Sequence, residues 1–182
     1  MVQYRPRSVP LALKDMKRVV SYSDGEGDGA GVGVCVWATG MAEPLAAYLA
    51  IPPELRRIWN TKLGTDEIGN DIYLIEAVGP LVLLSTFPKV LNNSLWLHFI
   101  DNTSAQYSLV RGSSSVYSGD HIIGLTWEVS ARLGTYPYYD RVHTKSNPID
   151  GVSRLDFAGP WGRVHAARLP IETILERFRE NT

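Results

Sequence analysis

Hydrophobic and polar residues between positions 18 and 51 follow the pattern of short β-strands. Apolar, β-branched and aromatic residues fill three stretches separated by turn residues, which predicts strands over about 18–24, 31–38 and 43–51. The glycine-rich segment 25–33 is typical of a hairpin turn. Because the connections are short, we expect the three strands to pair antiparallel as a meander.

After residue 52 the apolar residues recur with helical spacing in several segments. Further spacings predict helices over 54–59, 71–87, 103–110, 120–133, 150–154 and 169–180, and strands over 95–100 and 138–142. Residues 64–70 indicate a loop. Pro80 is expected to kink the helix over 71–87 or delay its start, because proline lacks the amide donor and crowds the preceding turn.

Three strands followed by alternating helices and strands define the expected architecture. This order predicts an α/β fold with a five-stranded mixed sheet, three antiparallel strands followed by α/β units, and helices on its faces. In such a sheet the first and fourth strands are neighbours and run parallel. We expect residues 1–16 to be an irregular lead-in or linker, and residues 17–182 to form one domain ending in a helix.

Composition narrows the classes of partner and compartment. Hydrophobic residues make up 45% of the 182 residues and the net charge is −1, so any nucleic-acid partner must be held by a local patch rather than by a global basic field. Cys35 is the single cysteine, which fits a reducing compartment. No apolar run approaches the roughly 20 residues of a membrane span, and we expect no secretion signal. We therefore expect an intracellular protein of the cytoplasm or nucleus, without a membrane partner.

Four acidic residues stand at notable places in this order. Asp24 ends the first strand, Asp101 ends the fourth, Asp150 begins the helix after the fifth, and Glu76 lies in the helix over 71–87. Ligands collect at the carboxyl ends of strands in open α/β sheets. Four carboxylates gathered there would repel one another unless cations neutralise them. Two Mg²⁺ ions about 3.5–4 Å apart could activate a water and stabilise the leaving oxygen of a phosphodiester.

Four short motifs carry these acids. They are Ser23-Asp24-Gly25, Ile75-Glu76-Ala77, Phe99-Ile100-Asp101-Asn102 and the run Ser146-Asn147-Pro148-Ile149-Asp150-Gly151-Val152-Ser153-Arg154. In this order, over roughly residues 18–156, they resemble the ribonuclease H family, and most closely the ribonuclease H domains attached to retrotransposon reverse transcriptases. The resemblance implies the ribonuclease H-like fold and assigns the four acids to an Asp-Glu-Asp-Asp catalytic quartet. It further implies two Mg²⁺ or Mn²⁺ ions, endonucleolytic hydrolysis of the RNA strand of an RNA–DNA hybrid, and a reverse-transcriptase polymerase domain as a partner.

Some positions depart from the family pattern. His143, seven residues before the last aspartate, stands nearest to the family's loop histidine, and either a catalytic or a surface role is open to it. Asn102 replaces the usual serine and could bond a ribose 2′-OH or cap the helix that follows. Residues 52–70 lengthen the gap before Glu76, and Pro80 removes the amide that would bond to its carbonyl. The position of Glu76 is therefore the least fixed of the four acids.

Polar side chains around the motifs are the expected substrate contacts, because phosphate contacts supply most non-specific affinity for nucleic acid. They are Asn102, Asn147, Arg154, Lys145, Arg111 and His143. Weaker candidates are the cations Arg56, Arg57 and Lys62 and, for base stacking, Trp59, Trp127 and Trp161. Two other functions remain open for such a fold. One is another nuclease of the superfamily, a DNA exonuclease or a resolvase, and the other is a catalytically silent scaffold or nucleic-acid-binding domain.

Overall fold

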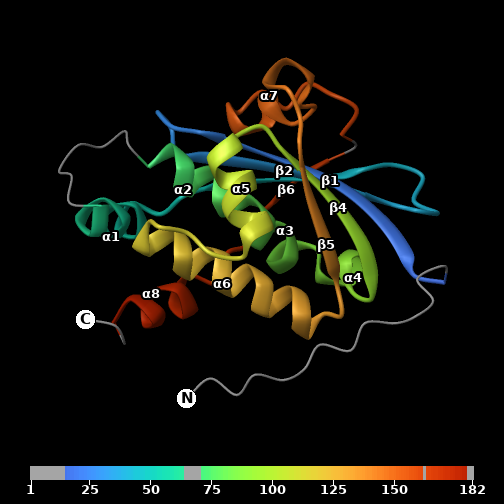
Figure 1. Cartoon of the computed structure of the whole chain (residues 1–182). Helices are drawn as coiled ribbons and strands as arrows, with labels where there is room; N and C mark the ends of the chain where they lie inside the picture. Colours follow the sequence, from blue (N-terminus) through green and yellow to red (C-terminus); the bar gives the residue numbers. More distant parts are fainter. Residues whose placement is uncertain (1–14, 64–70, 162, 180–182) are drawn as a thin grey trace.

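The computed structural model describes residues 15–63, 71–161 and 163–179 and is built on one mixed sheet with helices on both faces (Figure 1). The strands are β1 (Lys17–Glu26), β2 (Gly31–Ala38), β3 (Leu45–Ala50), β4 (Ser94–Ile100), β5 (Tyr136–Arg141) and β6 (Val164–Ala166). The α-helices are α1 (Pro53–Leu63), α2 (Ile72–Ala77), α3 (Gly79–Thr86), α4 (Pro88–Leu91), α5 (Thr103–Arg111), α6 (Tyr117–Arg132), α7 (Asp150–Ser153) and α8 (Ile171–Arg179). A single 3₁₀ turn, η1 (Thr144–Ser146), precedes α7.

The strand order is β5-β4-β1-β2-β3-β6, which confirms the predicted fold class. Strands β1, β2 and β3 pair antiparallel, whereas β4 runs parallel to both β1 and β5. The parallel register sets Tyr22 of β1 opposite Phe99 of β4, so the carboxyl ends of these strands lie side by side. The sheet has a sixth strand that was not predicted. It is β6, which pairs with β3 over three residues and is too short to show a period in the sequence.

Helices cover the two faces of the sheet unequally. On one face α3 comes so close to β1 that a Cβ added to Gly79 would lie 2.4 Å from Ser23 Oγ. On the other face α7 packs on β2, where a Cβ added to Gly33 would lie 2.7 Å from the Ser153 amide nitrogen. Figure 1 shows α7 separated from α6 and α8 by the sheet. Since both helices meet β1 near its end, that end is held from two sides.

A polar network buried under the helices fixes the last part of β1. His98 is fully buried on β4 and shares hydrogen bonds with Ser21 (Nδ1–Oγ 2.7 Å) and Ser23 (Nε2–Oγ 3.1 Å). The Trp96 indole N–H donates to Ser21 Oγ at 2.6 Å. Burial lowers the pKa of His98 to about 3, so the ring is neutral. The network satisfies buried polar groups and ties β1 to β4 just before Asp24.

Pro80 splits the helix expected over 71–87, as its missing amide predicted. Helix α2 ends at Ala77 and α3 begins at Gly79, with Pro80 in its first turn, where the absent N–H costs nothing. Glu76 therefore lies in the last turn of α2, beside the end of β1. The short helix α4 was not predicted, and the other helices match their predicted segments with shifted ends; α1 is longer and α6 begins at Tyr117. Residues 1–14 of the lead-in expected over 1–16, and the loop over 64–70, lie outside the described residues.

Trp59 is fully buried in the main core, which excludes it from base stacking. The indole N–H of half-buried Trp127 donates to the Leu109 carbonyl, and Trp161 packs against the apolar cluster under α7. None of the three tryptophans is among the exposed large hydrophobic residues, so their expected stacking role is not supported. Among the described residues, no helix has both the length and the apolar character needed to span a bilayer.

Arg56 has an internal partner rather than a free charge. Its Nε donates to the carboxylate of Asp71, which is fully buried, and its Nη2 group donates to the Gly27 carbonyl at 2.7 Å. The guanidinium thus connects the β1–β2 turn to the residue before α2. This corrects its interpretation as a solvated or phosphate-binding cation. The side chain of Lys62 lies outside the described residues.

Replacing Arg56 with alanine is expected to destabilise the protein by about 3–5 kcal/mol, because the Asp71 carboxylate would stay buried without its partner. Urea unfolding followed by circular dichroism measures the change. Arg168→Ala, at an exposed arginine before α8, is the matched control and should stay within about 0.5 kcal/mol of the wild type. Equal effects of the two substitutions would show that the ion pair contributes little.

Candidate metal centre

Three acidic side chains from separate elements converge beyond the carboxyl ends of β1 and β4. Asp24 comes from β1, Glu76 from α2, and Asp101 from the residue after β4. Each offers one carboxylate oxygen, and these oxygens lie within 4.8 Å of one another. Asp24 and Glu76 are buried and Asp101 is half-buried. The convergence joins three of the four acids predicted from the sequence.

The trio opens to the outside through a pocket. Its lining residues are Asp24, Gly25, Glu26, Gly27, Ile72, Glu76, Asp101, Asn102, Thr144 and Arg154. Gly25 allows a close approach, because an added Cβ would lie 3.0 Å from Ile75 Cγ2 and 3.1 Å from the Glu76 amide nitrogen and would crowd α2. The close approach of α2 to β1 at this glycine brings Glu76 to Asp24 despite the long intervening segment.

Burial and mutual repulsion raise the proton affinity of two of these acids. Burial raises the pKa of Asp24 to about 6, with smaller contributions from the charges of Asp101 and Asp150, and a hydrogen bond from Ser153 opposes the shift. Burial and the charges of Asp101 and Asp24 raise the pKa of Glu76 to about 9, against a hydrogen bond from the Gly25 backbone. Without a cation, Glu76 is therefore protonated at neutral pH, whereas Asp24 is mostly ionised.

The donor set fits a hard divalent cation. All three groups are carboxylates, the ligands that Mg²⁺ and Mn²⁺ favour. Glu76 Oε2 is buried and has no hydrogen-bond partner among the described residues, although buried polar atoms are normally satisfied. A cation held by Asp24, Glu76 and Asp101 would satisfy this oxygen and remove the repulsion that raises the two pKa values.

Asp150, the fourth predicted acid, lies at the rim of the site and outside the converging trio. Its Oδ1 accepts from Arg154 Nη2 at 3.3 Å, in an exposed pair one turn apart on α7. Its charge nevertheless contributes to the raised pKa of Asp24. Because exposed ion pairs are worth only about 0–1 kcal/mol, little free energy holds Asp150 on Arg154.

Asn102 caps α5, one of the two roles considered for it. Its Oδ1 accepts from the Ala105 amide at 3.0 Å, and the residue lines the acidic pocket. The cap uses Oδ1, so the amide nitrogen is the group available for a ribose contact. His143 and Lys145 are exposed next to η1, where His143 Nδ1 accepts from the Lys145 amide, and Arg111 is exposed in the last turn of α5.

Asn147, predicted as a substrate contact, is buried and bonded inside the protein. Its amide nitrogen donates to the Ser23 carbonyl at 2.9 Å and lies 3.3 Å from Asp24 Oδ1. Ser153, which the sequence interpretation left without a role, donates to Asp24 Oδ2. Its position three residues after Asp150 was the available signal, since residues three apart on a helix share a face.

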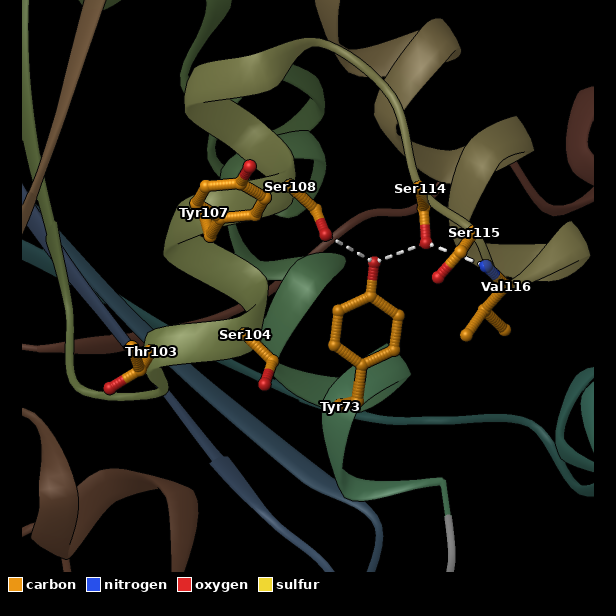
Figure 2. A pocket seen from close by; sticks show the side chains of 8 residues that line it. All are labelled: Tyr73, Thr103, Ser104, Tyr107, Ser108, Ser114, Ser115 and Val116. Atoms are coloured by element: carbon orange, nitrogen blue, oxygen red, sulfur yellow. Dashed lines mark hydrogen bonds between the residues drawn. The ribbon is translucent and has the colours of Figure 1, made fainter.

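A second pocket, whose lining residues mostly carry hydroxyl groups, lies beside α5 (Figure 2). It is lined by Tyr73, Thr103, Ser104, Tyr107, Ser108, Ser114, Ser115 and Val116. The Tyr73 hydroxyl bonds to Ser108 Oγ at 3.0 Å and Ser114 Oγ at 2.8 Å, which joins α2, α5 and the loop after α5. The start of α5 separates the pockets, with Asn102 lining one and Thr103 the other. This pocket has no local signal in the sequence, because its residues come from three segments.

Comparison with known proteins gives similarity at the level of structure only. No protein-family model matches the sequence, and no curated protein matches it. A crystal structure of LC11-RNase H1 in complex with an RNA/DNA hybrid has a TM-score of 0.43 and 12% identity, covering 71% of this chain and 88% of that chain. A structure of LC11-RNase H1 isolated from compost by a metagenomic approach has a TM-score of 0.42 and 13% identity, covering 71% and 87%. The protein described here is therefore defined by its own strand order and acidic trio, as a mixed α/β protein with a candidate divalent-cation site.

Proposed function

We propose that this protein is a divalent-metal-dependent nuclease that hydrolyses the RNA strand of RNA–DNA hybrids. The observation that carries the proposal is the convergence of Asp24, Glu76 and Asp101 within 4.8 Å at the carboxyl ends of parallel strands. Bound Mg²⁺ or Mn²⁺ would activate a water and stabilise charge on the scissile phosphate. Asp24 is the central ligand in this proposal, and Asp150 completes the quartet from the rim.

The surroundings of the trio suit an extended polyanionic substrate. Arg154 lines the acidic pocket and Lys145 is exposed on the neighbouring turn. These two basic side chains could contact phosphates although the protein as a whole is not basic. The amide nitrogen of Asn102 is the proposed donor to a ribose 2′-OH, the group that distinguishes RNA from DNA. The pocket beside α5 is proposed to contact the sugar–phosphate backbone through its hydroxyl-bearing residues.

We also propose that the domain works beside a reverse-transcriptase polymerase. The support is the run from Ser146 to Arg154, whose Asn, Asp and Ser-Arg follow the order seen in retrotransposon ribonuclease H domains. Two residues of this run lie at the acidic site: Asn147 bonds to Asp24, and Arg154 lines the pocket. A domain of this kind would act on hybrids made by the polymerase.

The substrate is tested by offering labelled RNA–DNA hybrid, duplex DNA and duplex RNA to the protein in MgCl₂. We expect cleavage of the RNA strand of the hybrid alone, and loss of cleavage when a chelator removes the metal. Activity confined to duplex DNA would contradict the proposal and favour a DNA exonuclease or a resolvase. Failure to cleave any substrate while binding metal would favour a silent nucleic-acid-binding domain.

A further inference from the structure

Both carboxylate oxygens of Asp24 face hydrogen-bond donors from one short segment. The Asn147 amide nitrogen lies 3.3 Å from Oδ1, and the Ser153 hydroxyl donates to Oδ2. These donors stand at opposite ends of the segment 147–153, more than 120 residues after Asp24 in the chain. The segment therefore holds the carboxylate from both sides.

The donors are themselves held rigidly on the sheet. Ile149 and Val152 are fully buried against Cys35 of β2 and Ala46 of β3, which anchors α7. Asn147 also donates to the Ser23 carbonyl at 2.9 Å, so its amide is fixed to the β1 backbone. Asn147 and Ser153 are 6% and 2% exposed, and buried donors of this kind are costly to leave unpaired.

Two glycines of β2 make room for this segment. A Cβ added to Gly31 would lie 2.4 Å from the Ser153 carbonyl oxygen, and one added to Gly33 would lie 2.7 Å from its amide nitrogen. Gly33 is also the residue paired with Asp24 across the β1–β2 ladder. A side chain at either position would push Ser153 away from Asp24. The hairpin glycines thus have a role in the site beyond turning the chain.

The arrangement leaves the Asp24 carboxylate able to bind a cation. Each carboxylate oxygen has about two lone-pair positions, so one hydrogen bond on each leaves the other position open. The two bonds fix the rotation of the carboxylate, and the trio's other members approach it from α2 and β4. Residues that orient a metal ligand in this way usually change metal affinity by about 10–100-fold when replaced.

We propose that Asn147 and Ser153 are positioning residues that fix Asp24 for divalent-cation binding. The proposal rests on the proposed function, because it assigns the cation to the acidic trio. It separates the roles within the segment 147–154. Asn147 and Ser153 act on Asp24 from inside the protein, whereas Asp150 and Arg154 stand at the pocket rim.

The test is calorimetric titration of the full chain with MnCl₂. Ser153→Ala and Asn147→Ala are each expected to weaken Mn²⁺ binding about 10–100-fold. Ser130→Ala is the matched control, since Ser130 is an equally buried serine on α6 whose hydroxyl donates to the Thr126 carbonyl at 2.8 Å. It should bind Mn²⁺ like the wild type. Thermal melting in a chelator confirms that each variant is folded at the titration temperature.

A double substitution separates positioning from a general effect on stability. In an Asp24→Asn background, Ser153→Ala should not weaken Mn²⁺ binding further, because the residue it positions has already lost its charge. Wild-type-like Mn²⁺ binding by both single variants would overturn the positioning role, even if the hybrid is cleaved. If the variants bind Mn²⁺ more weakly than the wild type but the wild type cleaves no nucleic acid, the positioning role is supported and the proposed nuclease is rejected. If Asn147→Ala does not fold, Ser153→Ala decides alone.

Discussion

Asp24→Asn is expected to reduce Mg²⁺-dependent cleavage of an RNA–DNA hybrid by roughly 1,000-fold or more, equivalent to at least about 4 kcal/mol of activation free energy. Asparagine has the same shape but carries no charge, so the trio loses its central anionic ligand. Single-turnover cleavage at saturating hybrid and MgCl₂ measures the change. Asp140→Asn, at an exposed carboxylate of β5, is the matched control and should cleave at the wild-type rate.

The same variant is expected to be folded and, without divalent metal, at least as stable as the wild type. The substitution removes a buried charge that burial and its acidic neighbours disfavour. Hydrogen bonding is preserved, because the new amide oxygen can accept from Asn147 and the new amide nitrogen can donate to Ser153 Oγ. Near-normal cleavage by the folded variant would show that Asp24 is not the central ligand.

The stability of the metal-free protein is expected to fall as the pH rises from about 4 to about 9. The pKa of Asp24 is raised from 3.8 to about 6 and that of Glu76 from 4.5 to about 9, so the folded state binds these protons more tightly than the unfolded chain. Their stabilisation is complete below the unfolded values and is lost as the pH passes through the folded values. We expect a loss of several kcal/mol, or more than roughly 10 °C in melting temperature for a chain of this size.

Divalent metal and substitution of Glu76 should both flatten this dependence. Saturating Mg²⁺ replaces the protons and stabilises the folded state by binding it preferentially. Glu76→Gln removes the group with the larger shift, so its melting temperature should vary less above pH 6. Melting curves from pH 5 to pH 9, with and without MgCl₂, provide the measurement. An identical pH dependence for the wild type and Glu76→Gln would mean that Glu76 does not carry the buried proton.

The fold was predictable because its main strands carry their own periodic signal. The adjacency of β1 and β4 followed from topology, and it correctly brought Asp24 next to Asp101. The position of Glu76 did not follow from local sequence. Its approach to Asp24 depends on Gly25 and Gly79, which let α2 and α3 contact β1 without side chains between them.

The direction in which side chains of the 147–153 segment face could not be predicted, because it depends on contacts with residues far away in the sequence. Asn147 was predicted as a substrate contact together with the other polar side chains around the acidic motifs. It is buried because Ile149 and Val152 dock α7 on β2, a contact that the sequence does not show. The same docking faces Ser153 toward Asp24 and leaves Asp150 at the rim. The pocket beside α5 was missed for a similar reason, since its residues gather only after α2 and α5 have packed.

Anomalous diffraction from crystals grown with MnCl₂ and an RNA–DNA hybrid tests the central claim most directly. We expect Mn²⁺ peaks within about 2–2.5 Å of carboxylate oxygens of Asp24 and of Glu76 or Asp101, with a phosphate of the RNA strand on the open side. Mn²⁺ absent from the trio, or the DNA strand lying against it, would contradict hydrolysis of the RNA strand at this site.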